Sequence, residues 1–162
     1  MRDLTSAAPA PPGSGDHVRG PETARAVIFY ADFTCPDCAV AALALKEMPV
    51  RVHFRHFAMS SRSRRAVPLA AAAEAAGRQG RFWEFHDSVF GDPGHTDDPH
   101  LWERCEALGL DIGQFDIDRR SGETEALVRA QTSEALRAGA AGTPSFVVDG
   151  ELHASLAEAL PG

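Results

Sequence analysis

Residues 34–38 read Thr34-Cys35-Pro36-Asp37-Cys38, and the rest of the chain is organised around this stretch. It follows the apolar run Ala26–Tyr30 and precedes a helix-forming run that begins near Pro36. The first turn of a helix has unpaired backbone N–H groups and the positive end of the helix dipole, and both favour a thiolate over a thiol. This position predicts that Cys35 is a nucleophile and that Cys38 is its resolving partner.

Two cysteines at this spacing also occur in zinc sites, and an inert buried pair is a further alternative. A structural zinc site needs about four ligands. The remaining ligand candidates are scattered in the sequence: Cys105, His53, His56, His86, His95 and His100. No second Cys-x-x-Cys or His-x-x-x-His pair completes a set, so the pattern favours redox chemistry and predicts no metal site.

A strand over Arg25–Ala31, a helix over Pro36–Lys46 and a strand over Val50–Phe57 form a βαβ unit. Such a unit predicts two parallel strands joined by a right-handed crossover. Residues 66–140 then show only helical patterns. Ser145–Val148 and Glu151–His153 are two short extended runs joined by Asp-Gly, which is typical of a β-hairpin.

The chain has 162 residues, of which 44% are hydrophobic, which suits a single domain with a full core. A net charge of −7 argues against general nucleic-acid or anionic-membrane binding. Residues 1–16 are rich in Ala, Pro, Gly and Ser and have no apolar leader stretch, so we expect a disordered tail and a cytoplasmic location. No segment is long and apolar enough to predict a transmembrane helix.

Thr143-Pro144 lies directly before a predicted strand, where a simple turn is the default interpretation. In combination with the cysteine stretch, however, the sequence resembles the thioredoxin superfamily, and more closely its DsbA-like branch. Four segments carry the resemblance: Phe33–Cys38, Phe54–Phe57, Gly80–His86 and Gly142–Pro144. The resemblance implies an α/β fold with a thioredoxin-like mixed β-sheet and an all-helical insertion. We place a single domain at 17–162 and the insertion at about 58–140.

The resemblance also implies a role for each residue of the motifs. Cys35 would be the exposed nucleophile and Cys38 the buried resolver, with Pro36 and Asp37 modulating them. Pro144 would be a cis-proline facing the disulfide, and Thr143 would offer backbone groups to an extended substrate peptide. The implied activity is thiol–disulfide exchange with proteins or small thiols, without a metal or an organic cofactor. Two alternatives remain: a glutathione-dependent transferase or isomerase, and a peptide-binding module.

Two positions differ from the pattern of the family. Thioredoxin-like proteins often carry a buried acid six residues before the nucleophilic cysteine, and here that position is Phe29. Asp37 occupies the place where strongly oxidising relatives carry histidine. A carboxylate there disfavours the thiolate, so we expect a potential nearer ~−270 mV than ~−120 mV.

Other residues admit both a functional and a structural interpretation. Arg62, Arg64 and Arg65 form a loop cluster that could attract an anionic thiol such as glutathione, although a solvated loop is the default. Cys105 lies between Leu101 and Leu108 and is expected to be a small core residue.

Overall fold

The computed structural model describes residues 7–13 and 15–162. In this part of the chain, five strands form one sheet in the order β1-β3-β2-β4-β5. They are β1 (His17–Arg19), β2 (Arg25–Ala31), β3 (Val50–His56), β4 (Ser145–Val148) and β5 (Glu151–His153). Strands β2 and β3 run parallel, and the other neighbouring pairs run antiparallel. The predicted mixed sheet with its parallel βαβ unit is confirmed.

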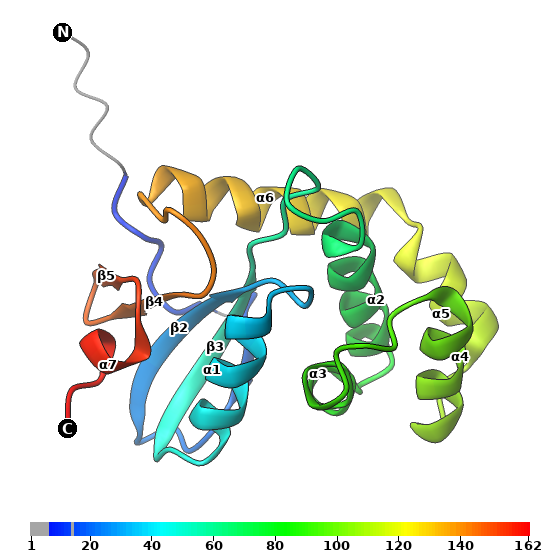
Figure 1. Ribbon diagram of the computed structural model, residues 1–162, viewed down its shortest axis with the longest axis horizontal. Helices are drawn as coiled ribbons and strands as arrows, with labels where there is room; N and C mark the ends of the chain where they lie inside the picture. Colours follow the sequence, from blue (N-terminus) through cyan, green and yellow to red (C-terminus); the bar gives the residue numbers. More distant parts are fainter. Residues whose placement is uncertain (1–6, 14) are drawn as a thin grey trace, which may run out of the picture.

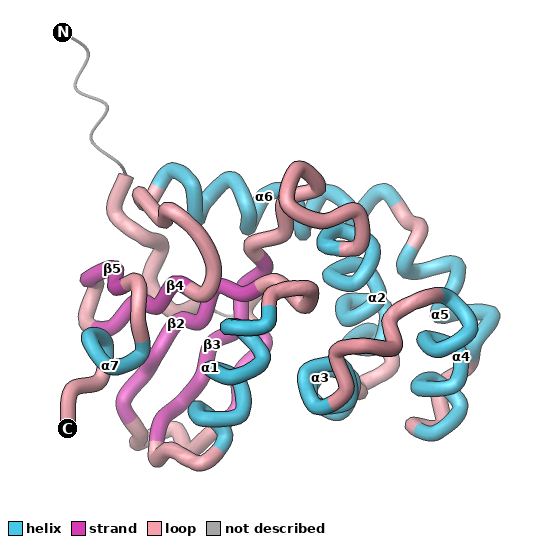
Figure 2. The backbone as a smooth tube through the Cα atoms, in the orientation of Figure 1, coloured by secondary structure: helices cyan, strands magenta, loops and turns pink. Residues whose placement is uncertain are grey.

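The helices divide into one group beside the sheet and one inserted block. They are α1 (Pro36–Lys46), α2 (Ala66–Arg78), α3 (Phe82–Gly91), α4 (Asp98–Ala107), α5 (Ile112–Arg119), α6 (Gly122–Arg137) and α7 (Leu156–Ala159). Figure 1 shows α1 and α7 against the sheet and α2 to α5 packed together at its side. Helix α6 leads from this block back across the sheet (Figure 2). The insertion between β3 and β4 is therefore entirely helical, as predicted.

Strand β2 is apolar on both faces because both faces are covered. On one face Phe29 packs in the core with α1, and its ring stacks on Phe146 of β4 at a centroid distance of 5.5 Å. On the other face Ile28 and Tyr30 pack against Ala135 of α6. Continuous apolar sequence is what a strand covered on both sides requires.

Strand β1 is not among the strands that the sequence predicts, the first of which begins at Arg25. In the structure, His17–Arg19 pairs antiparallel with β3 at the edge of the sheet. Three residues are too few to show a period of two, so the pairing partner decides whether such a segment is a strand.

Some residues of the predicted tail contact strand β3. The Asp16 carboxylate accepts hydrogen bonds from the buried Arg55 side chain at 2.7 and 3.1 Å. Arg55 also donates to the backbone carbonyls of Ala10 and Pro11, at 2.8 and 2.7 Å. These contacts attach the end of the predicted tail to β3. The prediction of disorder also covers residues 1–6 and 14, which lie outside the described residues.

The C-terminal hairpin has the geometry that its sequence predicts. Asp149 and Gly150 both have positive φ, at 52° and 80°, and join β4 to β5. A two-residue turn with both residues in this conformation matches the twist of the flanking strands. The short helix α7 follows the hairpin.

Candidate functional site

The two cysteines of the central stretch lie in the first turn of α1. Cys35 is the N-cap residue with extended backbone angles (φ −89°, ψ 119°), and Pro36 opens the helix. Proline suits this position because its missing N–H would have no partner in the helix. Cys35 is partly exposed, whereas Cys38 is completely buried. Both are thiols in this structure, so it describes the dithiol form.

Antiparallel pairing brings the second predicted motif to the cysteines. Ser145, the first residue of β4, pairs with Tyr30 near the end of β2. The segment that precedes β4 therefore lies beside the segment that follows β2. As a result the Cys35 thiol donates to the Thr143 carbonyl oxygen at 3.6 Å. The Thr143–Pro144 peptide bond is cis.

The Cys38 thiol is in an environment that opposes ionisation. Burial raises the pKa of Cys38 well above its usual range, and the adjacent Cys35 acts in the same direction. The backbone of Asp32 and the side chain of Thr143 oppose this shift without overcoming it. Cys38 therefore stays protonated at neutral pH in the dithiol form, and its proton must leave before it can act as a nucleophile.

Two acidic residues, Asp32 and Asp37, lie near the cysteines. Within the described residues, neither carboxylate forms a hydrogen bond to Cys38. Phe29 has a hydrocarbon side chain and is fully buried in the core, so this position offers no proton acceptor. The Asp32 carboxylate is also buried and accepts from the backbone N–H and the hydroxyl of Thr34, at 2.8 and 2.7 Å. Asp32 thereby orders the approach to Cys35, a role that the sequence did not indicate. Asp37, like Pro36, is exposed in the first turn of α1.

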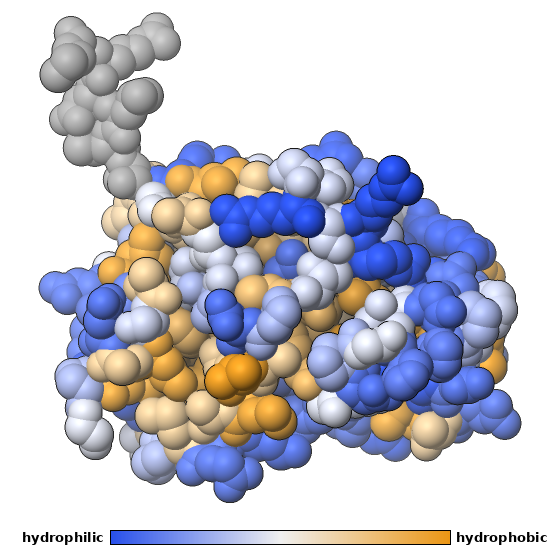
Figure 3. Space-filling view, viewed as in Figure 1, coloured by the Kyte–Doolittle hydropathy of each residue, from blue (hydrophilic) through white to orange (hydrophobic). Residues whose placement is uncertain are grey.

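Exposed apolar side chains lie on α1 beyond the cysteines. Val40 and Leu43 are 68% and 54% exposed. Figure 3 shows apolar surface in this region of the front face. The site is therefore an open surface that adjoins the exposed apolar side chains of α1, rather than an enclosed chamber. A cavity of about 420 Å³ between residues 58–61 and α6 is lined by none of the six predicted site residues.

The third cysteine belongs to the core of the helical block. Cys105 lies on α4 with no solvent exposure, and burial raises its pKa to about 11. It is bonded to no other cysteine of the described chain. These surroundings agree with the packing role that the sequence suggested for it. No group of three or more His, Cys, Asp or Glu residues in the described ranges is arranged to hold a metal ion.

A buried polar cluster lies below the site, at the junction of sheet and insertion. The Glu74 carboxylate of α2 bonds to His17 Nε2 at 2.5 Å and to His56 Nε2 at 3.1 Å. Burial opposes ionisation of Glu74, but the hydrogen bonds from His17 and His56 prevail and lower its pKa to about 2. His56 is buried, and its contact with Glu74 makes it a hydrogen-bonded structural residue.

Comparison with known proteins identifies the family. Residues 47–162 match the sequence profile of the DSBA-like thioredoxin domain. A thioredoxin-like oxidoreductase from Silicibacter pomeroyi has 28% identity and a TM-score of 0.74, covering 94% of this chain and 87% of that one. BdbD from Bacillus subtilis has 17% identity and a TM-score of 0.75, covering 95% and 91%. The thioredoxin-like fold predicted from the sequence is confirmed.

Curated relatives carry a different name. A protein of Salinispora arenicola named Na(+)/H(+) antiporter NhaA 1 is 35% identical over 144 residues, covering 85% of this chain and 22% of its own length. This chain thus spans about a fifth of the length of that relative. Within the described residues, no helix combines the length and the apolar character needed to cross a membrane. The family profile covers most of the chain, so the protein is a member of the DsbA-like thioredoxin domain family.

Proposed function

We propose that the chain is a thiol–disulfide oxidoreductase with Cys35 as nucleophile and Cys38 as resolving thiol. One observation carries the proposal. An accessible sulfur stands at a helix N-terminus, 3.6 Å from the Thr143 carbonyl, with a second, buried sulfur one helical turn behind it. The membership in the DsbA-like family supports the same activity. The antiporter name of the curated relatives does not enter the proposal, because this chain matches only 22% of such a protein.

In the reducing direction, the Cys35 thiolate attacks one sulfur of a substrate disulfide. A Cys35–substrate bond forms, the substrate S–S bond breaks, and the leaving thiolate takes up a proton. Cys38 then loses its proton and attacks the Cys35 sulfur, which releases the second substrate thiol. The substrate gains two electrons and two protons, and Cys35 and Cys38 are left as a disulfide. The oxidising direction follows the same steps in reverse, and neither direction requires a metal or an organic cofactor.

Thr143 and Pro144 are proposed to bind the substrate. The N–H and carbonyl groups beside the cysteines can pair with an extended peptide, which supplies affinity without demanding a particular sequence. The exposed apolar side chains of Val40 and Leu43 extend this surface along α1. The physiological partners are proposed to be proteins or small molecules with thiols or disulfides. The cytoplasmic location expected from the sequence stays a prediction.

The proposal is tested by trapping the covalent intermediate. Cys38→Ser should accumulate a mixed disulfide between Cys35 and a model disulfide peptide, because no thiol remains to resolve it. Cys35→Ser should give no adduct at all and is the matched control. Intact-mass measurement before and after addition of a reductant identifies the bond.

The same variants separate this activity from the two alternatives. A transferase needs one activating residue and no resolver, so its turnover with glutathione and an electrophile would persist in Cys38→Ser. A binding module would bind the peptide in both variants without forming a bond. Either result, in the absence of a trapped adduct, would remove the oxidoreductase assignment.

A further inference from the structure

The three arginines of the loop before α2 point to different parts of the structure. Arg65 donates to the Thr96 carbonyl at 2.5 Å and lies 3.5 Å from an oxygen of Asp98. Arg62 donates to the Ala141 carbonyl at 3.0 Å. Arg64 is exposed and makes no side-chain hydrogen bond to the described residues. The sequence cluster therefore separates, and Arg62 is the member that contacts the segment leading to Pro144.

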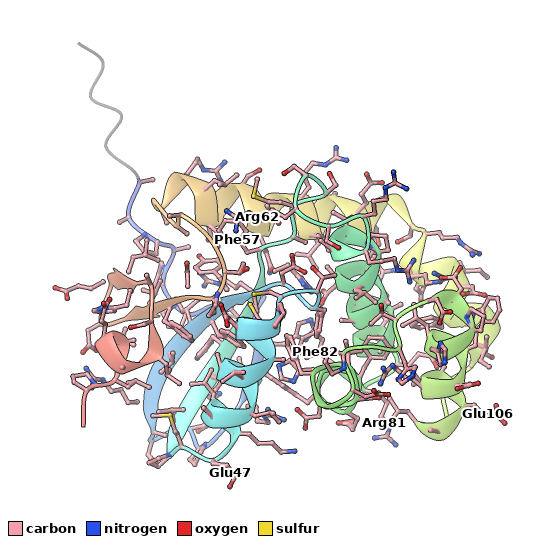
Figure 4. All side chains as sticks on the ribbon, in the orientation of Figure 1. Glu47, Phe57, Arg62, Arg81, Phe82 and Glu106 are labelled. Carbon is pink, nitrogen blue, oxygen red and sulfur yellow. The ribbon has the colours of Figure 1, made fainter. Side chains whose placement is uncertain are left out.

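The contact places the Arg62 guanidinium against the backbone segment that leads to Thr143 and Pro144. Ala141 precedes Thr143 by two residues, so their carbonyls are separated by no more than about 7 Å. The Thr143 carbonyl is the group that accepts from the Cys35 thiol. Arg62 Nη1 also lies 3.0 Å from the position that a Cβ atom would take at Gly142, so the guanidinium rests directly on this backbone. Figure 4 shows Arg62 beside the segment that leads into β4.

The charge of Arg62 is available to a ligand. The side chain is exposed, and it forms no ion pair with a carboxylate of the described residues. A guanidinium has five N–H donors, and the Ala141 carbonyl uses one of them. The remaining donors form the planar fork that matches a carboxylate. In a chain of net charge −7, this is a local positive group at the margin of the site.

We propose that Arg62 binds a carboxylate of the substrate next to the disulfide that Cys35 attacks, so that the protein prefers acidic substrates. This inference rests on the exchange function proposed above. The carboxylates of glutathione and the acidic side chain of a peptide share the required chemistry. Arg62 is a specificity residue in this scheme: it holds the substrate and takes no part in the transfer of electrons.

The test compares pairs of substrates in which one member carries carboxylates and the other carries an ester or an amide in their place. The small pair is glutathione disulfide and the disulfide of glutathione diethyl ester. The peptide pair carries Glu or Gln beside the disulfide-bonded cysteine. Reduction by the dithiol protein is followed for the wild type, Arg62→Ala, Arg62→Lys and Arg64→Ala. The Cys35–Cys38 potential is measured in each variant to show that the redox centre itself is unchanged.

Arg62→Ala should lower the second-order rate constant of reduction about tenfold for the acidic member of at least one pair, because that substrate binds more weakly. The members without carboxylates should change little, Arg62→Lys should retain part of the preference, and Arg64→Ala should resemble the wild type. A loss confined to glutathione disulfide or to the Glu peptide supports the proposal and identifies the source of the carboxylate. The preference should also weaken as salt is added.

Two results would overturn the inference while leaving exchange intact. An equal loss on the members with and without carboxylates would show that Arg62 only supports the backbone of residues 141–143. Equal rates for wild type and Arg62→Ala on every substrate would show that it binds nothing. A wild-type protein that exchanges with none of the four disulfides would instead overturn the proposed function, and this inference with it.

Discussion

At the scale of single residues, the two cysteines differ because of their positions in one helical turn. Cys35 is accessible at the N-terminus of α1 and contacts the Thr143 carbonyl. Cys38 is fully buried, and burial raises its pKa. In the proposed exchange reaction, a substrate therefore reaches Cys35 first, and Cys38 reacts only with a sulfur already attached to Cys35. This order of reaction follows from access and protonation together.

The raised pKa of Cys38 makes the resolving step dependent on pH. At pH values below the pKa of a thiol, the fraction present as thiolate increases about tenfold for each pH unit. We expect the release of the second substrate thiol to accelerate correspondingly between pH 6 and 8. Rapid mixing of the Cys35 mixed disulfide into buffers of different pH measures this rate. A rate that levels off below pH 8 would indicate a base that serves Cys38.

Asp37 offers a second residue-scale prediction, because its carboxylate lies in the first turn of α1 between the cysteines. Asp37→His should raise the reduction potential by about 30 mV or more, since removing the negative charge favours the thiolate and hence the reduced form. Asp37→Asn removes the charge without adding an imidazole and should give an intermediate value. Equilibration with glutathione buffers measures the potentials. A potential that falls in Asp37→His would contradict the electrostatic argument.

At the scale of elements, strand direction assembles the site. Helix α1 begins where β2 ends, and β4 begins opposite the same end because it pairs antiparallel with β2. The helical block is inserted in the sequence between β3 and β4, and both of these strands still pair with β2. Its first loop carries Arg62 to the segment before β4. The site therefore depends on the position of three chain segments rather than on α1 alone.

The turn between β1 and β2 packs so closely against the start of β3 that Gly20 has no room for a side chain. Gly20 has φ +116°, and a Cβ atom there would lie 2.3 Å from the Val50 carbonyl oxygen. Gly20→Ala should lower the free energy of unfolding by at least about 2 kcal/mol, because both strain and a backbone clash must be relieved. Gly91→Ala is the matched control, since a Cβ atom there meets nothing within 4 Å. Urea unfolding of both variants measures the difference, and equal stabilities would show that the turn can rearrange.

At the scale of the whole molecule, buried polar contacts connect the sheet to the inserted helices. Glu74 of α2 binds His17 of β1 and His56 of β3. On the other face, Tyr30 donates to Glu134 of α6 at 2.8 Å and accepts from Arg55 at 3.1 Å. A buried acid or base that lost its partner would be left unpaired, which is costly. These contacts therefore specify how the insertion is oriented on the sheet.

The lowered pKa of Glu74 links folding stability to pH. Its pKa falls from 4.5 to about 2 in the folded protein. The stabilisation is therefore complete above pH 4.5 and is lost as the pH falls toward 2. Glu74→Gln should remove stability on the order of 3 kcal/mol at pH 7 and flatten the acid side of the stability profile.

Urea unfolding at several pH values measures the effect of Glu74→Gln. Glu47→Gln is the control, because this exposed residue follows the C-terminus of α1 and points away from the core (Figure 4). A stability profile for Glu74→Gln that runs parallel to that of the wild type below pH 4.5 would show that Glu74 does not provide the linkage.

Much of the fold was predictable because its signals are local. Hydrophobic runs indicated β2 and β3, Pro36 indicated the start of α1, and Asp149-Gly150 indicated the hairpin. The edge strand β1 was missed because three residues show no period, and its pairing with β3 is what makes it a strand. The contacts of Asp32 were missed for a similar reason, since the sequence does not reveal which way a side chain turns after a strand ends.

The sequence by itself determined the reactive stretch, the βαβ unit and the helical character of the insertion, because periodicity and turn chemistry act over a few neighbouring residues. Only the tertiary structure decided which distant groups meet that stretch. Cys35 and Thr143 are separated by 108 positions, and Arg62 and Ala141 by 79. Such contacts depend on the pairing of β4 with β2 and on the packing of the inserted helices. No local pattern specifies either of them.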